Sequence, residues 1–273
     1  MSWLEAIVLG LVQGLTEFLP ISSTAHIRIV SAMAGWSDPG AAFTAVTQLG
    51  TETAVLLYFR KDIWRIASAW VRSLVRPAER GSLDARMGWY VIIGTVPIGI
   101  LGFAFRHSIE TAARDLRLIA AMMILVGFVL LLADRVGSRH RELGDLNIVD
   151  ALIYGLAQAC ALIPGVSRSG GTISAGLFRG YSRTAATRYS FLLAIPAVLI
   201  SGLFETLKIG DDQTSSWGPT ILATAIAFCV GYAVIAWLLK YIANHSFLPF
   251  AIYRISVGVL VFGLLAAGTI TPR

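Results

Sequence analysis

Two short polar segments interrupt otherwise apolar sequence in this chain, and the first carries side chains that could transfer a phosphoryl group. Gln13 and Glu17 are four residues apart and therefore share one face of a helix. Hydroxyl groups and an imidazole follow Pro20, at Ser22, Ser23, Thr24 and His26. Carboxylate, hydroxyl and imidazole are the attacking group, base and metal ligand of nucleophilic phosphoryl transfer. The pattern does not assign these roles, and Gln13, Ser22 and Thr24 are equally compatible with helix caps and interhelical contacts.

The second segment is a turn rich in glycine and serine, Pro164-Gly-Val-Ser-Arg-Ser-Gly-Gly-Thr172, followed by helical sequence. Backbone N–H groups in such a turn and at a helix N-terminus can bind an anion. Arg168 adds a planar guanidinium that can hold two phosphate oxygens at once. The turn is not a Walker A loop, because no Gly-Lys-Ser/Thr follows at the required spacing. The alternative is a plain loop joining two half-helices.

The two segments belong to an internal repeat. Residues 5–13 (EAIVLGLVQ) match residues 150–158 (DALIYGLAQ) at a constant offset of 145. Repeats built on interrupted helices are a common way for membrane proteins to place a polar site near the middle of the bilayer.

The composition of the chain indicates that these segments lie in a membrane. Of the 273 residues, 56% are hydrophobic and 14% are charged, whereas soluble domains carry about 25% charged residues. Six apolar runs are each close to the roughly 20 residues that cross a bilayer as a helix; they are residues 41–59, 87–105, 116–133, 185–204, 219–239 and 247–270. We therefore expect an all-α integral membrane protein with six full transmembrane helices in one polytopic domain, residues 1–273. The net charge of +6 comes from loop arginines and does not indicate a nucleic-acid partner.

The Lys and Arg residues of the loops predict which side of the membrane each loop lies on. Residues 60–86 contain seven Lys and Arg, which places this loop in the cytoplasm. Alternating the spans gives fourteen Lys and Arg inside and six outside, with both termini on the outer face. Residues 1–35 then begin and end outside, and residues 150–183 begin and end inside. We expect two re-entrant helix-loop-helix hairpins in an inverted-topology repeat, with repeat 1 over about 1–134 and repeat 2 over about 148–273.

The sequence also predicts roles for other residues in and beside the apolar runs. An ionisable group in a membrane segment is costly, so Glu17 is expected to be functional. Glu52 and Arg254 are either ion-pair partners or groups that support the site. Residues 63–75 alternate apolar and basic side chains as an interfacial amphipathic helix does. Cys160 and Cys229 are expected to be inert packing residues of the core and not a disulfide or metal pair.

The two polar segments together resemble the undecaprenyl-diphosphate phosphatase family, the bacterial bacitracin-resistance membrane proteins. The resemblance rests on Gln13-x-x-x-Glu17, Pro20-x-Ser-Ser-Thr-x-His26 and Pro164-Gly-x-Ser-Arg-Ser-x-x-Thr172. It extends to Gln48-Leu-Gly50 and to Phe247-x-Pro-Phe-x-Ile-Tyr-Arg254, and so covers nearly the whole chain.

The resemblance implies a reaction and a site. The reaction is hydrolysis of the lipid undecaprenyl diphosphate to undecaprenyl phosphate, which recycles the lipid carrier of cell-wall synthesis and confers bacitracin resistance. The site would open to the outer face of the bacterial plasma membrane and use a divalent cation, Mg²⁺ or Ca²⁺, on Glu17 and Gln13. Glu17, Ser23, His26 and Arg168 would be catalytic, with Ser23 and His26 as rival nucleophiles. Substrate would contact Gly165, Ser167, Ser169, Thr172, Ser22, Thr24 and Gln48.

One position departs from that family pattern, and one other function is compatible with the repeat. The motif allows Glu or Gln at its first position, and Gln13 provides no second carboxylate there. A polyprenyl-phosphate flippase could use the same anion site without cleaving the lipid. Assembly is left open between a monomer and a homodimer.

Overall fold

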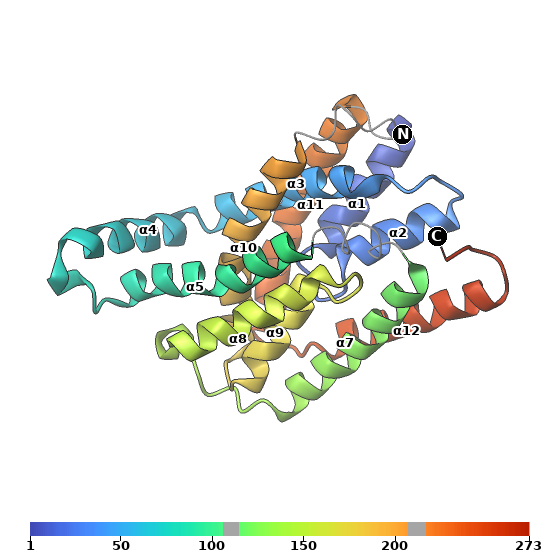
Figure 1. The fold of residues 1–273 in the computed structure, drawn as a ribbon. Helices are drawn as coiled ribbons and strands as arrows, with labels where there is room; N and C mark the ends of the chain where they lie inside the picture. Colours follow the sequence, from blue (N-terminus) through green and yellow to red (C-terminus); the bar gives the residue numbers. More distant parts are fainter. Residues whose placement is uncertain (106–114, 207–216, 273) are drawn as a thin grey trace.

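The computed structural model describes residues 1–105, 115–206 and 217–272, which form helices and no β-sheet (Figure 1). The α-helices of this part are α1 (Trp3–Thr16), α2 (Ser23–Met33), α3 (Gly40–Tyr58), α4 (Arg60–Val75), α5 (Leu83–Ala104), α7 (Leu116–Val136), α8 (Ile148–Ala159), α9 (Arg168–Phe178), α10 (Arg183–Thr206), α11 (Trp217–Ile242) and α12 (Leu248–Ala266). Short 3-10 turns lie at Pro77–Glu79, Leu143–Asp145 and Cys160–Leu162.

Five helices of the described chain are long and apolar enough to cross a membrane: α5, α7, α10 over Arg183–Gly202, α11 and α12. They correspond to five of the six predicted spans. The remaining run, residues 41–59, forms α3, which has 19 residues but is not among the five. This helix packs against α10 and α11 and carries the buried Glu52, so it contributes a polar face to the interior.

Both polar segments form helical hairpins. α1 packs against α2, and α8 packs against α9. The second helices, Ser23–Met33 and Arg168–Phe178, begin and end at positions related by the offset of the sequence repeat. Each hairpin helix has 11 to 14 residues, which is too short to cross a bilayer.

Each hairpin packs against a long helix of the opposite repeat. α1 lies along α11, and α8 lies along α5. Gly10 of α1 and Gly155 of α8, which occupy equivalent positions in the two repeats, make these approaches possible. A Cβ atom on Gly10 would lie 2.7 Å from the carbonyl oxygen of Ala223, and one on Gly155 would overlap the carbonyl oxygen of Gly94. Small residues allow membrane helices to approach this closely, so the matched glycines fix the depth of both hairpins in the bundle.

The base of the second hairpin is held by a buried carboxylate. Asp150 accepts hydrogen bonds from Arg141 (2.6 Å), Arg179 (2.7 Å) and Tyr181 (2.7 Å). Its counterpart Glu5 lies in a capping box at the start of α1. The two hairpins are therefore anchored differently although their helices match.

Helix α4 and the first half of α5 form an arm that projects from the bundle (Figure 1). The arm, which contains residues 60–86, ends opposite the two chain termini. The predicted amphipathic helix is confirmed as α4; its placement at the membrane surface stays a prediction. Trp70 of α4 packs on Gly88 and Trp89 of α5, while Trp64 is 76% exposed.

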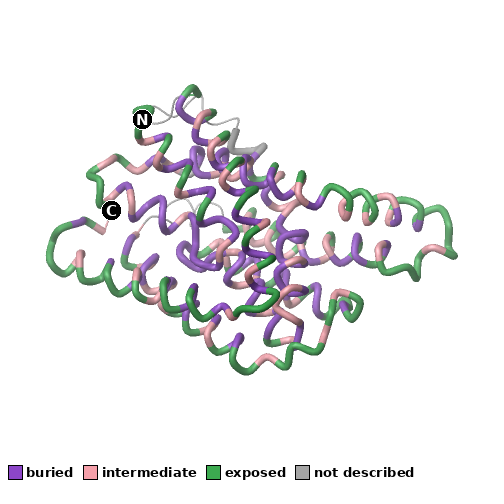
Figure 2. The backbone as a smooth tube through the Cα atoms, turned by 180° about the vertical axis from the view of Figure 1, so that it is seen from behind, coloured by how far each residue is buried: buried purple, intermediate pink, exposed green. Residues whose placement is uncertain are grey.

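Burial is concentrated where the helices cross (Figure 2). Many large apolar side chains are exposed on the surface. Phe103, Ile100 and Ile221 are each more than half exposed, as expected for side chains that face lipid. Cys160 and Cys229 are free thiols on this exposed surface. The prediction that they are packing residues of the interior was wrong, because an apolar helix in a membrane protein can place a cysteine against lipid as well as against the core.

Candidate active site

The tips of the two hairpins share a constrained backbone conformation. Ser22 has a φ of 74° and Ser167 a φ of 71°, a region that L-amino acids rarely occupy. Each serine directly precedes the second helix of its hairpin, so the same turn reverses the chain in both copies. Non-glycine residues held in this region occur at sites where the surrounding structure fixes them, frequently functional ones.

Glu17 is the centre of the polar cluster at the first tip. Glu17 is the C-cap of α1, and Pro20 prevents the helix from continuing beyond the turn. The turn brings Ser23 back to the carboxylate: Ser23 Oγ donates to Glu17 Oε2 at 2.5 Å, and Gln13 Nε2 donates to the same oxygen at 2.8 Å. All three side chains are buried. A hydroxyl that donates to a buried carboxylate is positioned to lose its proton to that carboxylate.

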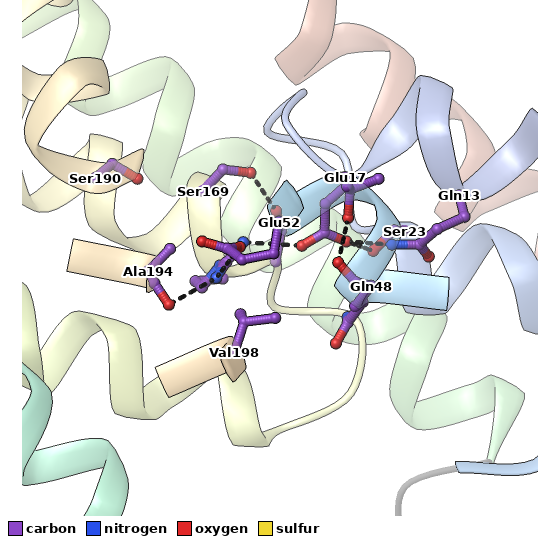
Figure 3. Close-up of polar contacts among 12 residues, drawn as sticks. Gln13, Glu17, Ser23, Gln48, Glu52, Ser169, Ser190, Ala194 and Val198 are labelled. Atoms are coloured by element: carbon purple, nitrogen blue, oxygen red, sulfur yellow. Dashed lines mark hydrogen bonds and ion pairs between the residues drawn. The ribbon is translucent and has the colours of Figure 1, made fainter. Parts of the chain in front are cut away.

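Arg168 reaches from the second tip to the first. Its Nη2 donates to Glu17 Oε1 at 2.9 Å, and its Nη1 lies 3.8 Å from Glu52 Oε2 on α3. Nη1 also donates to the carbonyl oxygen of Ala194 on α10 at 3.5 Å. Figure 3 shows Glu17, Glu52 and Ala194 coming together from different helices. The ion pair thus joins the two polar segments that the sequence repeat relates.

Ser167 and Ser169 hold the second tip in place. Ser167 Oγ accepts from the Gly170 N–H at 3.1 Å, as the N-cap of α9, and lies 3.1 Å from Ser169 Oγ. Ser169 Oγ donates to the Leu19 carbonyl oxygen of the first tip at 3.0 Å. The backbone N–H groups of Arg168 and Ser169 have no partner among the described residues. The helix N-terminus therefore presents free donors next to the guanidinium.

Gly165 and Thr172 belong to the same segment and are packed tightly against neighbouring helices. Gly165 has a φ of 87°, and a Cβ atom there would lie 2.5 Å from the Ile119 carbonyl oxygen. Thr172 Oγ1 donates to the Arg168 carbonyl oxygen at 2.8 Å and lies 2.5 Å from Ser190 Oγ of α10. Both residues thus support the turn that carries Arg168.

Arg254 of α12 holds the carbonyl groups of both tips. Its Nη1 donates to Pro20 O at 2.9 Å, and its Nη2 donates to Gly165 O at 2.8 Å and Val166 O at 3.1 Å. Its Nε donates to Met123 O at 2.9 Å, and the side chain is fully buried. No described carboxylate forms an ion pair with it. Of the two roles left open by the sequence, the structure places Arg254 as a support for the site.

His26 turns away from the carboxylate cluster. Its Nδ1 lies 2.7 Å from the Ser22 carbonyl oxygen and its Nε2 lies 3.0 Å from the hydroxyl of Tyr253, whose ring stacks on the imidazole. Because a carbonyl oxygen only accepts, Nδ1 donates to Ser22, while Nε2 and the Tyr253 hydroxyl form the second hydrogen bond. Among the described residues, His26 has no hydrogen bond to Glu17 or Ser23. Tyr253 was missed as a site residue, although it precedes Arg254 in the C-terminal motif.

The structure gives the remaining predicted substrate contacts no side-chain partner. Neither Gln48 nor Thr24 has a side-chain hydrogen bond within the described chain, and Ser22 contributes its carbonyl oxygen. Gln48 lies one turn before Glu52 on α3 and so faces the same side of that helix. The contacts from α10, at Ser190 and the Ala194 carbonyl, had no signal in the sequence because this helix has no motif of its own.

Oxygen donors suited to a divalent cation surround Glu17. Gln13 Oε1 and Glu52 Oε1 are buried and have no hydrogen-bond partner among the described residues. The same residues contain no group of three His, Cys, Asp or Glu side chains arranged as a metal site. Mg²⁺ commonly binds through one or two carboxylates together with the phosphates of a substrate. The donors present fit a hard cation shared with a phosphate ligand.

Comparison with known proteins identifies relatives along the full length of this chain. The family described as bacitracin resistance protein BacA matches residues 6–260. Undecaprenyl-diphosphatase 2 of Streptomyces coelicolor is 58% identical over 285 aligned residues, covering 100% of this chain and 98% of that protein. Undecaprenyl-diphosphatase of Streptomyces griseus is 60% identical with the same coverage, and that of Thermobifida fusca is 56% identical over 100% of this chain and 94% of its own.

Proposed function

Because this chain belongs to the bacitracin resistance protein BacA family and hydrolyses undecaprenyl diphosphate, we propose that the cluster around Glu17 is its active site. The products of the reaction are undecaprenyl phosphate and inorganic phosphate. The observation that carries the assignment is the contact between the hairpin tips. Arg168 of the second tip and Ser23 of the first hydrogen-bond to the two oxygens of one buried carboxylate, Glu17.

Ser23 is the attacking group in this proposal. Its Oγ attacks the terminal phosphorus of the diphosphate while its proton passes to Glu17 Oε2, the oxygen that it already contacts. The bond from that phosphorus to the bridging oxygen breaks, Glu17 gives the proton to the leaving phosphate, and undecaprenyl phosphate departs. Water then attacks the phosphoserine: Glu17 takes the water's proton and returns it to Ser23 Oγ, releasing phosphate. His26 is the weaker candidate because both of its ring nitrogens already have partners.

Hydrogen-bond donors held in place by the fold would stabilise negative charge on the phosphoryl group that is transferred. Arg168 can turn its guanidinium from Glu17 towards phosphate oxygens, and the first N–H groups of α9 lie at the base of that side chain. Preorganised donors of this kind act most strongly where water is excluded. Ser167, Ser169, Thr172 and Arg254 keep the turn in place, because each bonds to the backbone or side chains of the tips.

The cluster also fits a divalent cation, and we include one in the proposal. Glu17 and Gln13 would hold it, since they supply a carboxylate and a buried unpaired amide oxygen. Mg²⁺ or Ca²⁺ bound there would neutralise charge on the diphosphate oxygens.

The arrangement in the membrane follows from the same features. The chain is a multi-pass membrane protein, and we propose six spans, with α3 as the sixth, and two re-entrant hairpins within one domain of two repeats. The short hairpin helices support this arrangement, as do the seven basic residues of the arm, which lies opposite the termini. Both termini and the opening of the site then lie on the outer face of the plasma membrane. The apolar lipid tail can remain between helices while its diphosphate reaches the cluster.

Phosphate release from undecaprenyl diphosphate by the purified full-length protein tests the proposal. We expect release in Mg²⁺ or Ca²⁺, loss of release in a chelator, and a decrease of about a thousandfold or more for Glu17→Gln with the thermal midpoint retained. Glu5→Gln is the matched control, because Gln can replace Glu in the capping box at the start of α1. Absence of release in every cation would contradict the assignment and favour a carrier of polyprenyl phosphate.

A further inference from the structure

The motif Gln13-x-x-x-Glu17 has one carboxylate where a Glu at its first position would give two. The structure shows another carboxylate nearby, outside the motif. The first motif position is Gln13, whose amide is neutral. Glu52 lies on a different helix, α3, and its side chain is 1% exposed. We propose that Glu52 supplies the second carboxylate of the active site, replacing the charge missing at Gln13, and that Glu17 and Glu52 bind the divalent cation together. This inference rests on the proposed function.

The first support is the sharing of one arginine between the two carboxylates. Nη2 of Arg168 bonds to Glu17 at 2.9 Å, and Nη1 of the same guanidinium lies 3.8 Å from Glu52. Both carboxylates are buried, and Arg168, at 15% exposed, is the most accessible of the three side chains. The arginine therefore holds carboxylates from two different helices in one cluster.

The second support is a pair of buried oxygens without partners. Gln13 Nε2 donates to Glu17, which orients the amide and leaves Gln13 Oε1 as the free atom. Glu52 Oε1 is also buried and unpartnered within the described residues. Unpaired buried acceptors are rare in native proteins and call for a ligand such as an ion or water. Carboxylate and amide oxygens are the donors that Mg²⁺ and Ca²⁺ prefer.

A purely structural role for Glu52 agrees less well with the geometry. A buried pair that only stabilises the fold brings its charges to hydrogen-bonding distance and satisfies the remaining lone pairs. Here the distance from Arg168 to Glu52 is 3.8 Å, and one carboxylate oxygen has no partner among the described residues. Glu52 therefore keeps a buried carboxylate oxygen free to bind a ligand.

The test moves the carboxylate between the two positions. Glu52→Gln, Gln13→Glu and the double variant Gln13→Glu/Glu52→Gln are purified, and Ca²⁺ and Mg²⁺ affinities are measured calorimetrically with and without inorganic phosphate. We expect Glu52→Gln to weaken cation binding at least tenfold and to raise the cation concentration for half-maximal phosphate release by a similar factor. The double variant should recover affinity to within about threefold of the wild type, because it restores two carboxylates. Glu5→Gln is the control.

The outcomes separate this inference from the proposed function. Unchanged cation affinity in Glu52→Gln, or no cation binding by the wild type, overturns the role of Glu52. Weakened binding that Gln13→Glu fails to restore, together with a lower thermal midpoint, identifies Glu52 as a structural partner of Arg168 and also overturns it. If the wild type binds the cation through Glu52 but releases no phosphate, the inference stands and the proposed reaction fails.

Discussion

The two hairpin tips have nearly the same backbone and very different side chains. Ser22 and Ser167 have φ values of 74° and 71°, and each precedes a helix of 11 residues at equivalent positions of the two repeats. Arg254 binds the carbonyl oxygens of Pro20 and Gly165, which are also equivalent positions. The repeat is therefore preserved in the main chain down to individual carbonyl groups.

The side chains that follow the matched serines have diverged. After Ser22 comes Ser23, which donates to Glu17; after Ser167 comes Arg168, which donates to the same carboxylate from the other side. One copy thus carries the reactive hydroxyl of Ser23, and the other carries the positively charged guanidinium of Arg168. The comparison shows how an inverted repeat can build a symmetrical support and an asymmetrical site, because the chemistry of phosphoryl transfer needs an attacking group and a charge-stabilising group at different places.

Removing the hydroxyl of the first tip should have the largest effect. In Ser23→Ala we expect phosphate release to fall about a thousandfold or more, because the attacking group is lost while the contacts of Arg168 remain. A rapid-quench experiment with substrate labelled at its terminal phosphate should trap a phosphoryl-enzyme in the wild type and none in Ser23→Ala.

Two variants control this experiment. Ser31→Ala removes another buried hydroxyl from α2 and should react normally. His26→Ala should still form the phosphoryl-enzyme. If Ser23→Ala keeps the intermediate and His26→Ala loses it, the attacking group is the imidazole, and the comparison between the tips must be redrawn.

Replacing Arg168, the positively charged side chain of the second tip, should have the next largest effect. Arg168→Lys keeps the positive charge but loses the planar fork that contacts Glu17 and the Ala194 carbonyl together. We expect phosphate release to decrease about a hundredfold, the size expected for loss of a preorganised donor. Near-normal release, measured at saturating substrate and cation, would show that a point charge is sufficient and that geometry at this tip is unimportant.

The sequence predicted the matched parts of the molecule better than the diverged ones. The repeat offset, the two hairpins and the amphipathic α4 follow from local patterns, and Glu17, Ser23 and Arg168 do meet. The position of Glu52 against Arg168 could not be predicted, because it depends on how α3 packs against the tips. His26 was expected to be a reactive group together with Glu17 and Ser23, but its side chain contacts Tyr253 of α12 instead. Tertiary packing thus decided the contacts that no repeat or motif encodes.

The smallest expected effect tests whether the matched serines are equivalent. Ser167 Oγ caps α9 by accepting from the Gly170 N–H, whereas Ser22 makes no side-chain cap on α2. Ser167→Ala should therefore lower stability by about 1 kcal/mol, the usual value of an N-cap, and Ser22→Ala should change it by less than about half of that. Both substitutions keep the Cβ atom, so the cost of the positive φ is the same before and after each change. Thermal midpoints of the two variants in the same detergent provide the measurement, with a decrease of roughly 2–4 °C expected for Ser167→Ala only. Equal decreases would mean that the first tip has a cap in solution and that the two turns are alike in energy as well as in backbone shape.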